Sequence, residues 1–249
     1  MTAGVVVRAA EIGARDAGPG ASLRTLIDTG AGALGAGPAG AAGLVRYLAD
    51  LEPGGWLEGA VAGAGELWFV LGGAGQLEPA GHPAIALRAD RGILLPPGAA
   101  YRLSAGGEAL RVDIVTLPGP GDGPGHGPAR GQAAVTDFTD CAVETTGDRQ
   151  FRVLFGPGHG CTSATQFVGE IPPGRAPEHS HPYDEVVLIL AGHGVAHIGG
   201  TGHELAPGTC AHLPPGLPHC LENTGRDTLR VLGVFHPADS PAAKLAGSG

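Results

Sequence analysis

The sequence predicts an all-β protein made of two tandem barrels, and three observations carry this prediction. Short apolar runs recur along the chain and are split by turn formers, with 46 glycines and 22 prolines among 249 residues. Runs of this length and spacing are typical of strands in a sandwich or barrel. The segments between them show no convincing helical period, although a few helical turns are expected near residues 39–49. The third observation is an internal repeat.

The second half of the chain repeats the first at a displacement of about 119 residues. Glu66 falls on Glu185, and in both halves two glycines follow at the same distances. Leu-Pro-Pro-Gly recurs at 95–98 and 213–216, and a later Leu-Arg-Val segment also recurs. Agreement at so many spaced landmarks indicates two copies of one domain.

Strand positions follow from the apolar runs of the second copy, each of which ends at Gly, Pro or Asn. The predicted strands are residues 165–171, 185–190, 195–198, 209–213, 219–222 and 229–235.

A Gly/Pro-rich segment between the copies has no apolar periodicity and indicates a linker of mixed stiffness. We therefore divide the chain into an upstream barrel, a linker, a downstream barrel and a loosely held tail. Their predicted limits are 1–118, 119–134, 135–237 and 238–249.

Charge and composition exclude several classes of function. The formal net charge is −9, with 15 basic against 24 acidic residues, so the basic footprint of a nucleic-acid binder is missing. No apolar run approaches the ~20 residues of a membrane span, and the first residues do not resemble a secretory signal. We expect a cytoplasmic protein without membrane or nucleic-acid partners that acts on a small molecule. Its four cysteines are too few and scattered for a disulfide framework.

Four residues of the second copy form a candidate metal site. His179 and His181 have the spacing that places both side chains on one side of a strand. Glu185 starts the next apolar run, and His219 follows a tight Pro-Pro-Gly-Leu-Pro turn. Three neutral imidazoles and one carboxylate suit one divalent transition metal, namely Fe²⁺, Mn²⁺, Ni²⁺, Co²⁺ or Zn²⁺, and leave one or two positions open.

These ligands belong to two longer spaced patterns that resemble the two motifs of the cupins. The first pattern is matched by Gly174, His179, His181, Glu185 and Gly192, and the second by Gly208, Pro214, Gly216, His219 and Asn223. One departure is that four residues, rather than the commoner five, separate Gly174 from His179. The resemblance covers about residues 150–237 well and 45–118 weakly, and the duplication makes the chain similar to a bicupin. It implies two double-stranded β-helix (jelly-roll-like) barrels, with the metal inside the downstream one.

The first copy departs from these motifs. Ala60, Ala62 and Tyr101 occupy the positions of the three histidines, and only Glu66 remains. One carboxylate without imidazoles holds a transition metal poorly, so we predict a metal-free upstream barrel with a structural or dimer-forming role. Because bicupins resemble fused dimers of single cupins, both a monomer and a homodimer are consistent with the sequence.

The resemblance favours a dioxygenase of the Fe²⁺ type acting on a small organic molecule. Glu185 is a possible base, as in quercetinase-type cupins, and Tyr183 and Gln166 are candidate pocket residues. The alternatives are a metal-dependent isomerase, lyase or decarboxylase on a sugar or keto acid, and a non-catalytic metal- or ligand-binding protein. Arg175 and Arg152 are the only arginines that the sequence places near the motif, which disfavours a phosphorylated substrate.

Overall fold

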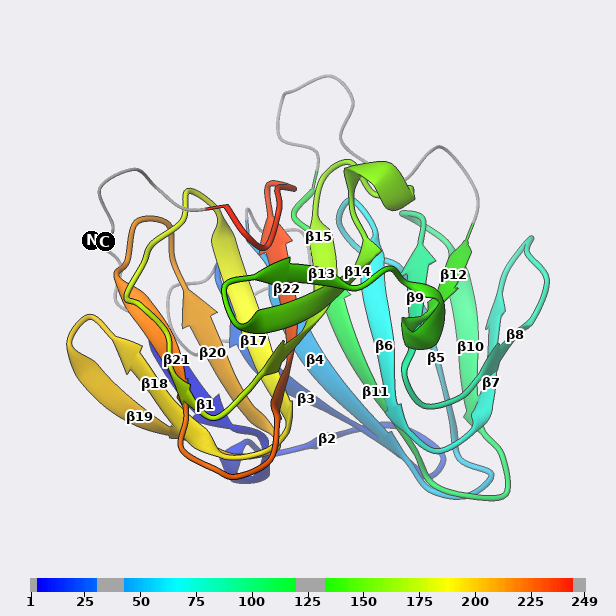
Figure 1. The fold of residues 1–249 in the computed structure, drawn as a ribbon. Helices are drawn as coiled ribbons and strands as arrows, with labels where there is room; N and C mark the ends of the chain where they lie inside the picture. Colours follow the sequence, from blue (N-terminus) through cyan, green and yellow to red (C-terminus); the bar gives the residue numbers. More distant parts are fainter. Residues whose placement is uncertain (1–3, 31–42, 120–132, 244–249) are drawn as a thin grey trace.

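Antiparallel β-sheets hold almost all of the regular secondary structure in the computed structural model, which describes residues 4–30, 43–119 and 133–243. Two barrels lie side by side, each made of a seven-stranded and a four-stranded sheet (Figure 1). The helices of the described residues are three single 3₁₀ turns, η1 (Ala9–Glu11), η2 (Phe138–Asp140) and η3 (Pro157–His159). The all-β prediction is confirmed.

The upstream barrel combines the following strands. Its seven-stranded sheet has the order β12 (Ala134–Asp137), β9 (Arg91–Leu95), β6 (Glu66–Gly72), β11 (Leu110–Thr116), β4 (Val45–Leu51), β3 (Ala21–Asp28) and β2 (Arg15–Gly18). Its four-stranded sheet has the order β5 (Trp56–Ala60), β10 (Ala100–Ala105), β7 (Gly75–Pro79) and β8 (Ile85–Leu87).

The downstream barrel repeats this arrangement. Its seven-stranded sheet has the order β1 (Val5–Arg8), β20 (Thr209–Leu213), β17 (Asp184–Ala191), β22 (Leu229–His236), β15 (Thr165–Ile171), β14 (Arg149–Phe155) and β13 (Glu144–Thr146). Its four-stranded sheet has the order β16 (Gly174–Arg175), β21 (His219–Asn223), β18 (Gly194–Ile198) and β19 (Thr201–Leu205). The six strands predicted here lie within one residue of the observed bounds.

The barrels exchange their first strands, so the sheets cross the predicted boundaries at two places. Strand β1 pairs with β20 of the downstream sheet, with Val5 opposite His212. Strand β12 pairs with β9 of the upstream sheet, with Ala134 opposite Leu94. Each copy therefore contributes its first strand to the other copy's sheet, and the division at 118 and 135 stays a prediction. The proposed linker falls almost wholly outside the described residues, as does the end of the tail.

The expected helical turns near residues 39–49 are absent from the described part of that segment, whose residues 45–51 form β4. This strand pairs with β3 on one side and β11 on the other. Its side chains are buried toward both faces, including Leu48, Ala49 and Leu51. Pairing with two neighbours therefore overrides the helix propensity of Ala and Leu.

A shared hydrophobic cluster joins the two seven-stranded sheets. Leu67 and Phe69 of β6 pack in it with Leu154, Val186 and Leu232 of the downstream sheet, and all are at most 1% exposed. One ion pair, Arg46 with Asp113, is fully buried; Arg46 Nε lies 2.9 Å from Asp113 Oδ1. Arg46 Nη2 also donates to the Leu232 carbonyl at 3.2 Å, which crosses from one barrel to the other.

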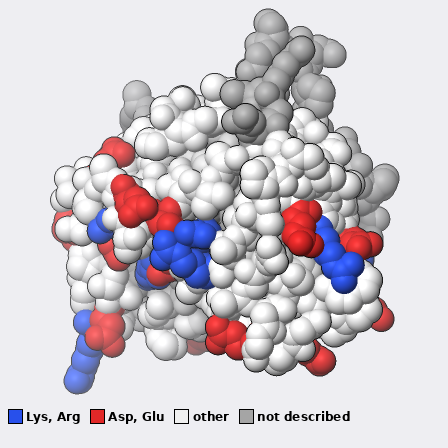
Figure 2. All heavy atoms as spheres, turned by 90° about the vertical axis from the view of Figure 1, so that its right-hand side faces the viewer, with Lys and Arg blue, Asp and Glu red and all other residues white. Residues whose placement is uncertain are grey.

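Charged side chains of both signs lie close together on one face of the molecule. On the face in Figure 2, basic side chains lie beside acidic ones and are separated by wide uncharged areas. Ion pairs such as Arg102 with Glu58 and Arg91 with Asp137 neutralise them locally. Among the described residues, no helix has the length and apolar character needed to cross a membrane.

Candidate metal centre

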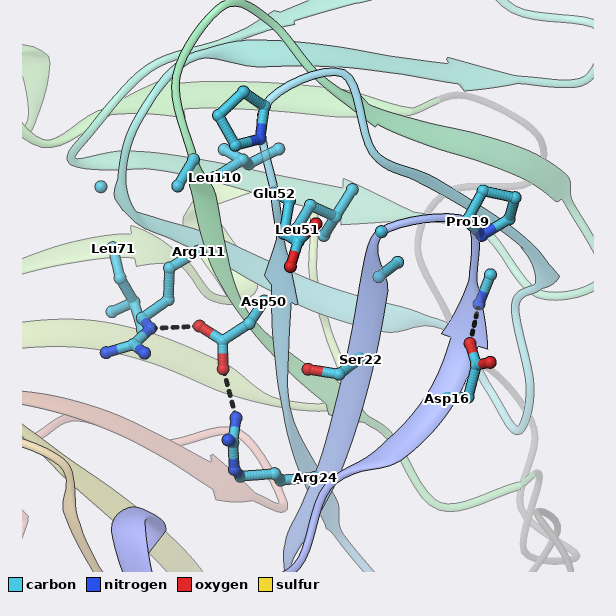
Figure 3. A pocket seen from close by; sticks show the side chains of 16 residues that line it. Asp16, Pro19, Ser22, Arg24, Asp50, Leu51, Glu52, Leu71, Leu110 and Arg111 are labelled. Carbon is cyan, nitrogen blue, oxygen red and sulfur yellow. Dashed lines mark hydrogen bonds and ion pairs between the residues drawn. The ribbon is translucent and has the colours of Figure 1, made fainter.

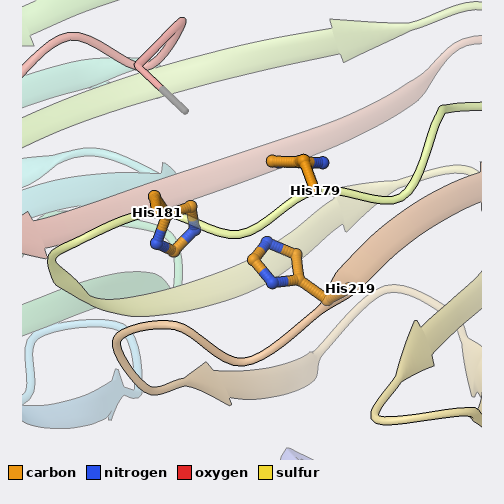
Figure 4. Close-up of side chains that lie close together, drawn as sticks. All are labelled: His179, His181 and His219. Atoms are coloured by element: carbon orange, nitrogen blue, oxygen red, sulfur yellow. The ribbon is translucent and has the colours of Figure 1, made fainter. Parts of the chain in front are cut away.

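Three histidines converge inside the downstream barrel (Figure 4). His179 and His181 lie on the extended segment between β16 and β17, and His219 opens β21. The backbones of His179 and His219 pair in both directions, with N–O distances of 3.0 and 2.8 Å. Each imidazole offers a nitrogen within 4.8 Å of those of the other two. The predicted convergence of these three residues is therefore observed.

The Pro-Pro-Gly turn explains how His219 reaches its position. Gly216 has a φ of +73°, a conformation that favours glycine. Its N–H donates to the His181 carbonyl at 2.9 Å, and Leu217 N–H donates to the Pro214 carbonyl at 3.2 Å. The turn thus ties the start of β21 to the segment that carries His181.

Backbone carbonyls fix the orientation of all three rings. The Nδ1 atoms of His179, His181 and His219 lie 3.3, 3.3 and 2.8 Å from carbonyl oxygens. These oxygens belong to Pro177, Tyr183 and Leu217. Because a carbonyl only accepts, these contacts favour a proton on Nδ1, and in the neutral form of each ring Nε2 then carries the lone pair. This arrangement is the usual support of a metal-binding histidine.

Glu185 on β17 is joined to this cluster through His181. Its Oε2 lies 2.7 Å from His181 Nε2, and both side chains are buried. The two atoms are not aligned as a hydrogen bond, and His181 Nε2 has no hydrogen-bond partner. An unprotonated Nε2 and a carboxylate oxygen repel each other at this distance unless a cation lies against both atoms. The residues present therefore fit a metal ion.

The protonation states also suit a metal. Burial opposes the charge of Glu185, but the imidazoles, His181 first, hold the pKa of its carboxyl below the usual range. Burial lowers the pKa of His219 to about 4, so this ring is neutral at neutral pH. Ionised carboxylates and neutral imidazoles are the forms that bind metals.

A small cavity of about 90 Å³ adjoins the histidines. Its wall is mainly apolar and includes Phe151, Phe167 and Tyr183. Arg149 is the one arginine among the described residues that line it. An apolar cavity with a few converging polar groups is the usual form of a small-molecule site.

A protein family matches the part of the chain that carries this site. The Cupin_2 family, described as a cupin domain, matches residues 167–235. The downstream barrel is a cupin domain. A comparison with curated protein sequences finds no match. The cupin resemblance of the sequence is thereby confirmed.

Solved structures show that the whole two-barrel cupin fold recurs elsewhere. The protein Ylba from E. coli superposes with a TM-score of 0.75 at 12% identity, covering 96% of this chain and 93% of that chain. A putative glyoxylate-induced protein from Pseudomonas aeruginosa gives 0.75 at 16%, covering 98% and 92%. A mutant of Bacillus subtilis oxalate decarboxylase gives 0.74 at 12%, covering 96% and 78%. At these identities the likeness shows the fold alone.

The structure places one of the two predicted pocket residues in the cavity and the other outside it. Tyr183 lines the cavity; its ring stacks on His181 at 4.1 Å and on Phe235 at 4.0 Å. Its hydroxyl donates to the Ser240 carbonyl at 3.4 Å. The expectation for Gln166 is corrected, because its amide lies 3.5 Å from the Trp68 carbonyl of the other barrel. Side chains alternate along β15, so its neighbour Phe167 faces the cavity instead.

Arg149 is the cavity residue that sequence reasoning missed, because it lies 30 positions before the first histidine. Thr146 pairs with Arg149 across the two-residue Gly147–Asp148 turn. A Gly-Asp pair between short polar-apolar runs is a hairpin signal. This signal could have predicted the hairpin, but not its position in the barrel, where Figure 1 shows β13 in front of β17 and β22.

The upstream cupin-like barrel has a cavity of about 230 Å³ but no histidine in it. Ala60, Ala62, Glu66 and Tyr101 all line this cavity, as the alignment of the repeats predicts. Among the described residues, the three histidines are the one cluster of potential metal ligands of that size. The absence of metal from the upstream barrel stays a prediction.

A wide open groove lies at the edge of the upstream barrel (Figure 3). Asp50 stands at its centre between Arg24 and Arg111, and Arg111 Nε lies 2.5 Å from Asp50 Oδ1. Both guanidinium groups of this groove are thus paired with the same carboxylate. The groove therefore offers no converging reactive groups like those of the downstream cupin.

Proposed function

We propose that this chain is a metal-dependent enzyme that acts on a small organic molecule at the downstream cupin centre. The observation that carries the proposal is the set of three imidazoles whose Nδ1 atoms are engaged by backbone carbonyls. Their Nε2 atoms and the Glu185 carboxylate form a set of nitrogen and oxygen ligands that leaves coordination positions open. Open positions are the mark of a reactive rather than a structural site.

The chain's own residues have separable roles in this proposal. His179, His181 and His219 would hold the metal, and Glu185 would either complete the set or accept a proton from the substrate. Tyr183 keeps the His181 ring in place by stacking on it. The apolar wall excludes water from the reacting atoms. A bound divalent metal would supply Lewis acidity, and Fe²⁺ would also supply electrons for O₂.

The first reaction class we propose is oxidation by O₂, as in dioxygenases. The cavity volume of about 90 Å³ restricts the substrate. The space therefore suits small molecules rather than large polycyclic ones. Small β-diketones are better candidates than flavonols for this reason.

A second class, a decarboxylase or related lyase, is favoured by the same volume. Small keto acids and dicarboxylates fit a space of this size. Bacillus subtilis oxalate decarboxylase, whose Mn(II) centres are named in one of the matching structures, shares the two-barrel fold. For that class Mn²⁺ or Zn²⁺ would act as a Lewis acid without O₂.

Metal analysis and two activity assays test these proposals. Protein purified without added metal is analysed for metal content and then loaded with Fe²⁺ or Mn²⁺. O₂ uptake with small β-diketones or catechols supports the dioxygenase. Product formation from keto acids without O₂ supports the lyase. Full metal occupancy with no turnover in either assay would instead indicate a binding protein, and failure to bind any metal would refute the proposed function.

A further inference from the structure

Arg149 places a positive charge in the wall of the cavity that adjoins the metal centre. It opens β14, directly after the Gly147–Asp148 turn, and its side chain is half-buried. Its Nη2 donates to the Leu221 carbonyl at 3.1 Å. This contact holds the guanidinium against β21, the strand that begins with His219.

The guanidinium of Arg149 takes part in none of the ion pairs found among the described residues. Eight other arginines are paired with carboxylates: Arg8, Arg24, Arg46, Arg88, Arg91, Arg102, Arg111 and Arg230. The acidic group next to Arg149 in the chain is the exposed Asp148 on the turn. A partly desolvated cation that meets only a carbonyl is stabilised further by an anion.

The charge expected at the metal centre also favours a negatively charged ligand. Three neutral imidazoles and one carboxylate around a divalent cation leave a single positive charge, and Arg149 adds a second. Most of the remaining wall, including Phe151, Phe167 and Val187, is apolar, and its polar side chains Thr146 and Gln150 carry no charge. A small anion would therefore meet two cations in a low-dielectric space, where such attractions are strong.

We propose that Arg149 binds a carboxylate of the substrate, and that the substrate class is small carboxylic acids. This inference rests on the proposed metal-dependent function and deepens it. The planar guanidinium fork matches a planar carboxylate, and the cavity of about 90 Å³ has room for only a short acid. The acid would reach from Arg149 toward the histidines, so that its second functional group lies at the centre.

Calorimetric titration of metal-loaded protein tests the proposal. The probes are acetate and pyruvate, with neutral acetamide as a matched control and inorganic phosphate as a competing anion. We expect both carboxylates to bind, acetamide to bind at least tenfold more weakly, and phosphate not to exceed acetate. Equal binding of acetate and acetamide, or preferential binding of phosphate, would overturn the inference.

Three variants assign the effect to the side chain. Arg149→Gln is expected to weaken carboxylate binding about tenfold to a hundredfold, as expected for loss of a charge-assisted hydrogen bond. Its metal content should be unchanged. Arg149→Lys should recover part of the binding, and Arg175→Gln, which changes an exposed arginine outside the cavity, should bind as the parent does.

Failure of this inference is distinguishable from failure of the proposed function. Protein that holds metal but binds carboxylates equally well with and without Arg149 refutes the inference alone. Protein that holds no metal refutes the proposed function. If Arg149→Gln does not fold, Arg149→Lys and the comparison of acetate with acetamide on the parent protein still decide.

Discussion

The two barrels share their strands but engage the equivalent carboxylate differently. In the upstream barrel Glu66 accepts hydrogen bonds from the Trp68 indole at 2.9 Å and the Thr116 hydroxyl at 3.2 Å. In the downstream barrel Glu185 instead lies against His181. The sheet registers make Val187 and Phe235 the counterparts of Trp68 and Thr116, and neither side chain has a polar group.

The two cavities therefore differ in two features that bear on metal binding. The upstream cavity has Ala60, Ala62 and Tyr101 at the positions of the histidines, and its Glu66 accepts hydrogen bonds from Trp68 and Thr116. Both features agree with the prediction that the upstream barrel holds no metal. Its larger cavity, about 230 Å³ against about 90 Å³, fits the small size of the two alanines.

The largest effect is expected when a histidine of the downstream barrel is replaced by the residue at the equivalent upstream position. His181→Ala installs the side chain found at Ala62, and we expect metal content to fall from about one ion per chain to near zero. The loss should exceed the roughly 10–100-fold that second-shell changes cause. Elemental analysis after dialysis measures it, and circular dichroism should show the fold retained.

Tyr101→Ala is the matched control, because Tyr101 occupies the position of His219 in the barrel whose cavity has no histidine. Metal content should not change, although the edge contact of its ring with Trp68, with centroids 4.9 Å apart, is lost. An empty downstream site in this variant would show that the assignment of the upstream barrel is wrong.

A second test concerns the shared core, where the registers align Arg46 with Gln166 and Asp113 with Leu232. Arg46→Gln leaves Asp113 buried without its partner, and we expect a loss of about 3–5 kcal/mol in unfolding free energy. Urea denaturation measures this loss. The double variant Arg46→Gln/Asp113→Leu copies the downstream pair and should recover most of it, and no recovery would mean that the two sides of the interface are not equivalent.

The smallest expected effect is a pH dependence of the stability that comes from the buried carboxyl group of Glu66. Burial raises the pKa of Glu66 above its usual range, against the hydrogen bonds from Trp68, Ala62 and Thr116. A raised folded pKa gives stability that is complete below the unfolded pKa and is lost as pH rises through the folded value. Glu66→Gln does not titrate, so the stability of the parent relative to the variant should fall between pH 4 and pH 8. A constant difference across that range would contradict the raised pKa.

The sequence was informative where structure follows from local pattern. The downstream strands are bounded by Gly, Pro and Asn and alternate with turns, so their limits could be predicted closely. The metal ligands could be found because a short extended segment carries His179 and His181, and a fixed turn precedes His219. Both features act over a few residues, and the repeat made the missing histidines of the upstream barrel visible.

The parts that could not be predicted depend on contacts between distant residues. Strand β1 has four residues, and nothing in them says that their partner lies more than 200 positions away. The segment at β4 reads as a weak helix until two neighbouring strands satisfy its backbone. Gln166 and Arg149 lie on adjoining strands, and which of them faces the cavity is fixed by the register of the sheet.

The exchange of β1 and β12 has a consequence for how the molecule is assembled. A protein cut between the two copies would yield two fragments, each carrying a segment that closes the sheet of the other and each lacking its own closing strand. We expect that neither half would fold on its own, and that the three histidines would converge only after the two fragments are combined. On this expectation, the barrel whose cavity lacks histidines helps to fold the barrel that carries the histidine cluster.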